Sequence, residues 1–199
     1  GEGGASATGP TVGEIVISEI MYDPHGGLED DHAEWVELHN TTDEAIPTDG
    51  CVVVDAAHID PIAQEANLDG LLILPGDVLI LGRTNDQALN GGLGFDALFS
   101  FGLSNGGDTV ILICNGMEVD RVAYDDGDAF PDARQASIAR DGETLMGGDV
   151  LSPRWCLGEE LYLGDPEHRG TPGRANPGCP ILMNGACQSG ADCGEDARC

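Results

Sequence analysis

The chain has 199 residues, of which 41% are apolar, so it is long enough for one large or two small domains with an aliphatic core. Its 36 acidic and 8 basic residues give a formal net charge of −28. This charge excludes recognition of the nucleic-acid backbone, which requires a cationic surface, and no apolar run is long enough to cross a membrane as a helix.

The beginning of the chain is rich in glycine, alanine, serine and threonine, which predicts a flexible leader over residues 1–11. Such a leader becomes ordered when something holds it, for example a neighbouring subunit. Ile15 and Ile17 mark the apolar face of the strand that follows the leader. Three strands bounded by turn residues are predicted in this part of the chain, at residues 14–22, 34–40 and 51–55.

The middle and later parts of the chain repeat this pattern of short strands and turns. A polar insertion over residues 56–70 precedes two short strands that a Pro-Gly turn separates. These two strands are at residues 71–74 and 78–81. Further short apolar segments are predicted at residues 95–101 and 136–140, and residues 145–163 are expected to be irregular. Because no long helical period occurs, the pattern predicts an all-β sandwich.

The strongest local signal is a β-hairpin over residues 109–124. Asn115-Gly116 favours a type I′ turn, because both central positions of that turn need a positive φ. A two-residue loop would pair Cys114 with Met117, Leu112 with Val119 and Val110 with Arg121. In this register Val110, Leu112 and Cys114 face the core.

Seven cysteines occur, four of them within the last 21 residues. Because no CxxC pair is present and no histidine lies among these four, zinc binding is disfavoured. A disulfide-stapled tail over residues 179–199 in an oxidising, extracellular compartment is expected instead. An odd count leaves one thiol free or bridged to another chain. The seven candidates for disulfides are Cys51, Cys114, Cys156, Cys179, Cys187, Cys193 and Cys199.

Several motifs occur in a fixed order, the most specific being EWVEL at residues 34–38, LSNGGDTV at residues 103–110 and PGRAN at residues 172–176. The ordered set resembles a lamin tail domain of the type found in secreted bacterial proteins. The resemblance implies an immunoglobulin-like β-sandwich over residues 12–178 with long loop insertions and no catalytic residues. No coiled-coil rod is visible, so nuclear functions are not transferred.

The resemblance also bears on Cys51 and Cys114, which lie in or beside predicted strands. In other immunoglobulin-like sandwiches a disulfide joins the two sheets, so these cysteines are candidates for such a bridge. The alternative is two buried free thiols that act as small apolar groups. Cys156 is a candidate for stapling the irregular segment.

Two acidic loops are candidates for binding Ca²⁺, which takes six to eight oxygen ligands. The first contains Asp23, Asp30 and Asp31, and the second contains Asp125, Asp126 and Asp128. The alternatives are a solvated acidic loop and a turn with aspartates at its usual positions. Neither loop has EF-hand spacing, and the chain has no GxSxG motif for a nucleophile.

The expected function is that of a secreted, non-enzymatic structural module. It would be a self-associating subunit of an extracellular filament, appendage or surface coat, with copies of itself or other surface proteins as partners. Val12, Ile15 and Ile17 would add a strand to the sheet edge of a neighbour. The alternative is a Ca²⁺-dependent adhesion or binding module of a larger secreted protein.

Overall fold

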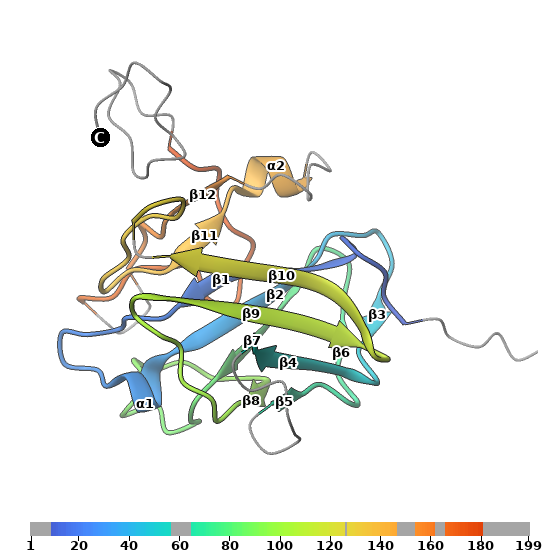
Figure 1. Cartoon of the computed structure of the whole chain (residues 1–199), viewed down its shortest axis with the longest axis horizontal. Helices are drawn as coiled ribbons and strands as arrows, with labels where there is room; N and C mark the ends of the chain where they lie inside the picture. Colours follow the sequence, from blue (N-terminus) through green and yellow to red (C-terminus); the bar gives the residue numbers. More distant parts are fainter. Residues whose placement is uncertain (1–8, 57–64, 126, 147–153, 162–165, 181–199) are drawn as a thin grey trace, which may run out of the picture.

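A computed structural model of the chain describes residues 9–56, 65–125, 127–146, 154–161 and 166–180. Within this part the fold is mostly β, as predicted (Figure 1). The strands are β1 (Ile15–Met21), β2 (Trp35–Asn40), β3 (Ile46–Pro47), β4 (Cys51–Asp55), β5 (Ala66–Asn67), β6 (Leu72–Ile73), β7 (Val78–Gly82), β8 (Ala97–Leu98), β9 (Gly107–Cys114), β10 (Met117–Asp125), β11 (Ile138–Arg140) and β12 (Trp155–Leu157), and the helices are α1 (Asp30–Ala33) and α2 (Gly142–Met146).

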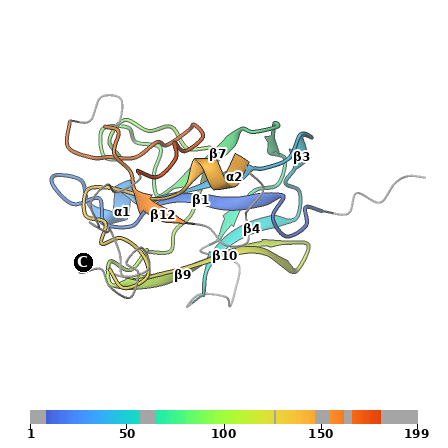
Figure 2. The same cartoon turned by 90° about the horizontal axis from the view of Figure 1, so that it is seen from above.

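The strands form two main sheets that face each other across an apolar core. One sheet has six strands in the order β12-β11-β1-β2-β7-β8, and the other has four in the order β10-β9-β4-β5. Figure 2 shows β9 and β10 in one layer and β1 and β7 in the other. A small third sheet pairs β3 with β6. This arrangement confirms the predicted immunoglobulin-like sandwich.

A β-bulge in β1 changes which of its residues face the core. Ile15 and Ile17 alternate into the core, but strict alternation would send Ile20 to the opposite face. The register between β1 and β2 shifts between Ile17 and Glu19, so that Ile20 and Tyr22 also enter the core. On β2, Val36 and Leu38 contact the same core, and Trp35 lies on the other face, as predicted.

The hairpin of β9 and β10 forms with the predicted turn but not with the predicted register throughout. Asn115 and Gly116 both have positive φ, and Met117 pairs with Cys114. The expected pairs of Leu112 with Val119 and Val110 with Arg121 are wrong. A shift between Glu118 and Asp120 pairs Leu112 with Asp120 and Val110 with Val122. This bulge brings three residues of uneven spacing to the core face: Val119, Val122 and Tyr124.

Besides the two-residue strand β5 in the polar insertion, three elements lie where irregular structure was expected. Helix α1 occupies part of the acidic loop, while α2 and β12 occupy parts of the segment predicted to be irregular. Each is three to five residues long, so none spans enough residues for a hydrophobic period to be visible.

The end of the described chain, residues 166–180, forms what we call the C-terminal strap. It crosses the outer face of the six-stranded sheet, opposite the main core. Here Thr171 N–H donates to Glu19 on β1, Gly173 N–H donates to Glu37 on β2, and the Asn176 amide donates to Ser18 O. The strap therefore covers a sheet face that would otherwise be exposed.

Candidate functional site

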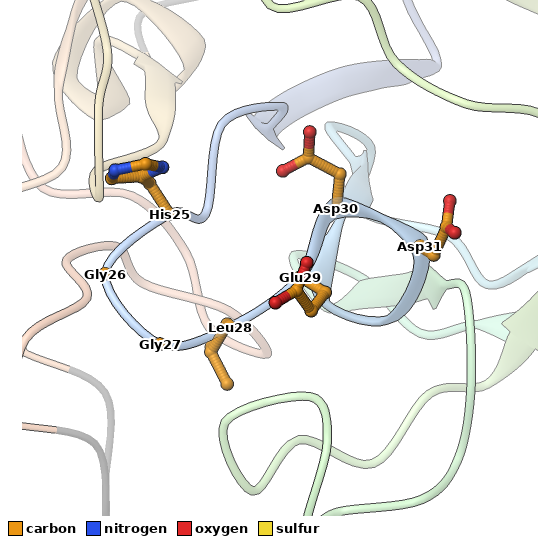
Figure 3. Close-up of a pocket in the computed structure, with 7 residues that line it drawn as sticks. All are labelled: His25, Gly26, Gly27, Leu28, Glu29, Asp30 and Asp31. Carbon is orange, nitrogen blue, oxygen red and sulfur yellow. The ribbon is translucent and has the colours of Figure 1, made fainter.

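An acidic hollow lies at one end of the sandwich, in the loop that connects β1 to β2. It has a volume of about 550 Å³ and is formed by one loop and the start of α1. Figure 3 shows that the carboxylates of Glu29, Asp30 and Asp31 point in different directions. The hollow is lined by His25, Gly26, Gly27, Leu28, Glu29, Asp30 and Asp31.

Several carboxylates near this hollow hold the fold together. Asp31 forms an ion pair with Arg83 at 3.4 Å, and Asp30 accepts a hydrogen bond from Asn105. Glu34, only 2% exposed, accepts from Arg83 at 3.3 Å and from Leu103 N–H at 3.1 Å. Burial raises the pKa of Glu34 to about 8. These contacts tie α1 to the turn that enters β9.

The structure does not gather the predicted calcium ligands. Burial and the charge of Asp30 raise the pKa of Asp23. Asp30 and Asp31 do not converge with Asp23 on one point, because they interact with Asn105 and Arg83. In the described ranges, no group of three or more His, Cys, Asp or Glu side chains is arranged to hold a metal ion. Calcium binding at the first loop therefore stays a prediction without a converging set of ligands.

The second acidic loop forms a turn around Asp125. The carboxylate of Asp125 accepts from the backbone N–H groups of Asp128, Ala129 and Phe130 at 2.9–3.1 Å. Asp128 is exposed, and Asp126 lies outside the described residues. The geometry is that of an aspartate at a turn position.

Two disulfides are present, and they revise the expected connectivity. Cys51 and Cys114 are bridged, but they are direct partners on β4 and β9 of the same sheet. The expected bridge between sheets is therefore wrong, because β4 joins β9 rather than facing it. Cys179 pairs with Cys156 on β12 and so ties the strap to the sandwich. Cys187, Cys193 and Cys199 lie outside the described residues.

The residues predicted to mediate self-association differ in exposure. Ile15 and Ile17 are fully buried on β1, which pairs with β2 along its length and with β11 only at Glu19 and Ile20. On the side away from β2, the Ile17 N–H donates to the Asp120 carboxylate. Self-association through Ile15 and Ile17 therefore stays a prediction. Val12, by contrast, is 64% exposed.

Val12 is one of four exposed apolar residues on segments at the same end of the sandwich. Figure 1 shows the start of the described chain, β3, β6 and the β9–β10 turn at this same end. Asn115 of that turn lies beside Gly9, and the Thr41 hydroxyl donates to Gly13 O at 2.5 Å. We call four side chains the apolar end: Val12 (64% exposed), Leu72 (52%), Leu74 (51%) and Met117 (59%).

Sequence reasoning did not identify Glu19 and Glu37 as buried acids. Both are fully buried and hydrogen-bonded to the strap or to neighbouring strands. The available signal was a Ser-Glu pair inside an otherwise apolar strand, since polar groups buried on both faces must find partners.

No helix in the described part of the chain is long and apolar enough to cross a membrane. The two disulfides are typical of a protein from an oxidising compartment. In comparisons with known proteins, the model of the Lamin Tail Domain family matches residues 8–126. A search of curated proteins gives no match.

Proposed function

The chain belongs to the lamin tail domain family, and we propose that it works as a secreted, non-enzymatic structural subunit that associates with copies of itself. The family is an immunoglobulin-like module that is typically structural. The assembly would be an extracellular filament, appendage or surface coat, with copies of this chain or other surface proteins as the partners.

The observation that carries the proposal is the apolar end. Single exposed apolar residues are normal on protein surfaces, but a group of them on a polar domain marks a contact site. Here four side chains, each more than half exposed, project from one end of a chain with 36 acidic residues. Contact through this end would remove apolar surface from water while the acidic faces stay solvated.

The net charge of −28 opposes contact between copies, so association should depend on salt. The Debye length falls from about 10 Å at 0.1 M salt to about 3 Å at 1 M. Screening therefore weakens the repulsion between acidic faces, while hydrophobic contact persists. We expect association to strengthen as the salt concentration rises.

The cysteine count provides a second support. Two disulfides use four of the seven cysteines, which leaves three. Three thiols can form at most one further bridge among themselves. At least one thiol thus stays free or bridges to another chain, and a covalent link to another subunit would be consistent with a structural role.

Sedimentation velocity at 0.1 M and 1 M salt tests the proposal. The unaltered chain should form larger species at high salt, and a Leu74→Asp/Met117→Asp variant should stay monomeric. Leu89→Asp/Leu161→Asp is the matched control, because it adds the same two negative charges at leucines that are 42% and 46% exposed and do not belong to the apolar end. This control should associate like the unaltered chain.

Two results would count against this function. A chain that stays monomeric at high concentration and at 1 M salt would refute self-association. Association that requires Ca²⁺ and survives the Leu74→Asp/Met117→Asp change would favour the calcium-dependent adhesion module instead.

A further inference from the structure

Two carboxyl groups face each other under the C-terminal strap. Glu19 on β1 and Glu37 on β2 are direct partners in the antiparallel ladder, and both side chains are fully buried. Directly opposed side chains in such a pair have Cβ atoms about 4.5–5.5 Å apart. Two buried like charges at this spacing repel strongly, so one proton between them is favoured.

The hydrogen bonds around Thr171 decide where that proton lies. The hydroxyl oxygen of Thr171 is 2.8 Å from Glu19 Oε2 and 2.9 Å from Asn176 Oδ1. A threonine hydroxyl has only one hydrogen to donate. If Glu19 were ionised, both neighbours would be acceptors, and one of the two contacts would lack a hydrogen.

The orientation of the Asn176 amide is fixed by its other partners. Its nitrogen donates to Ser18 O at 2.8 Å and to Arg140 O at 3.1 Å. Since both partners are carbonyl oxygens, the atom facing Thr171 must be the amide oxygen, which only accepts. The Thr171 hydroxyl therefore donates to Asn176, and the hydrogen between Thr171 and Glu19 must come from Glu19.

The other oxygen of Glu19 fits the same assignment. Glu19 Oε1 accepts from Thr171 N–H at 2.8 Å and from the Ser137 hydroxyl. This oxygen is the carbonyl of a protonated acid, and Oε2 carries the hydrogen. An unbroken series of donors then runs from Glu19 through Thr171 and Asn176 to the backbone of β1 and β11.

We propose that Glu19 is protonated in the folded protein at neutral pH and that its proton latches the C-terminal strap onto the sheet. When the proton leaves, Glu19 and Asn176 compete for the single Thr171 hydrogen. One contact becomes repulsive, and the strap loosens at alkaline pH.

The charged groups around the Glu19 carboxyl group favour its protonated form. Glu37 faces Glu19 from β2, and Arg174 faces it from the strap. Arg174 is itself half exposed and paired with Glu160 at 2.5 Å, so it compensates the buried pair only weakly. Burial raises the pKa of both Glu19 and Glu37.

Infrared spectroscopy of the full chain tests the assignment of the proton. A protonated carboxylic acid has a carbonyl stretch distinct from that of a carboxylate. Because burial also keeps Glu34 protonated at pH 7, the spectra are recorded in a Glu34→Gln background, where the folded protein should still show one such band. Glu19→Gln should remove this band, because it removes the carboxyl group. It should keep the strap in place, because the amide supplies the same hydrogen at the position of Oε2. Glu37→Gln, a matched loss of one carboxyl group from the same pair, should keep the band.

Hydrogen exchange on the unaltered chain tests the latch itself, independently of how the variants fold. The Thr171 and Gly173 amides should lose protection with rising pH, after correction for intrinsic exchange. The expected loss is about tenfold per pH unit above the pKa of the carboxyl. The Glu19→Gln variant should keep its protection at all these pH values.

Three outcomes would overturn the proposal. The first is that the protonated-acid band is absent at pH 7. The second is that the band disappears in Glu37→Gln. The third is that protection of the strap does not change between pH 7 and pH 10.

Discussion

Replacing Cys51 and Cys114 with alanine should destabilise the sandwich strongly without changing its fold. The bridge joins β4 to β9, the two central strands of the four-stranded sheet. Both residues are buried, and alanine fits a buried strand position without introducing a polar group. The main loss should therefore come from the unfolded state, which the bridge no longer restricts.

The size of the loss follows from the length of chain that the bridge closes. Cys51 and Cys114 are 63 residues apart, for which the chain-entropy relation gives roughly 4 kcal/mol. In a protein of this length each kcal/mol shifts the melting midpoint by about 2–4 °C. The expected decrease is therefore roughly 8–16 °C.

Thermal melting followed by circular dichroism measures this shift, and peptide mapping without reductant checks the pairing. The matched control is Cys156→Ala/Cys179→Ala, whose bridge closes 23 residues and should contribute roughly 3.4 kcal/mol. A decrease below about 3 °C for Cys51→Ala/Cys114→Ala would refute the reasoning. So would a mapped peptide that links either cysteine to a different partner.

Three further predictions concern single side chains. Because burial raises the pKa of Glu34 to about 8 from 4.5, the folded protein keeps a proton that the unfolded chain loses, and its stability falls as the pH rises between these values. Glu34→Gln should remove a slope of up to about 1.4 kcal/mol per pH unit from urea unfolding between pH 5 and pH 8. Asp120→Asn should cost about 3–5 kcal/mol in urea unfolding, because it removes the negative charge that lies 2.7 Å from the buried Arg140 guanidinium. The control Glu118→Gln removes an exposed ion pair and should change stability by less than about 1 kcal/mol; equal effects of these two variants would contradict the argument. Gly116→Ala should cost about 1–2 kcal/mol, since φ is +77° there and no atom blocks the added methyl group; an unchanged midpoint would contradict it.

The sequence predicted the parts of the fold that depend on neighbouring residues. The Asn115-Gly116 turn, the apolar face of β2 and the bounds of β4 all follow from local patterns. The two bulges could not be predicted in this way, because each depends on a partner strand. In the β9–β10 hairpin, for example, the register shift at Val119 places Val119, Val122 and Tyr124 on the core face.

The candidate sites were harder to predict, because they depend on which strands become neighbours. Cys51 and Cys114 were candidates for a bridge, but the sheet to which each belongs was not encoded near either residue. Glu19 and its strap partner Thr171 are separated by 152 positions in the sequence. For the acidic loops, composition alone could not distinguish aspartates that bind ions from aspartates that hold turns.

The disulfides also determine how the molecule responds to a pulling force. At about 3.4 Å per residue, the bridge between Cys51 and Cys114 withholds roughly 210 Å of extended chain, and that between Cys156 and Cys179 withholds roughly 80 Å. Stretched from its two ends, the reduced chain should therefore extend roughly 290 Å further than the oxidised chain. A subunit with this behaviour elongates less under tension while its disulfides are intact.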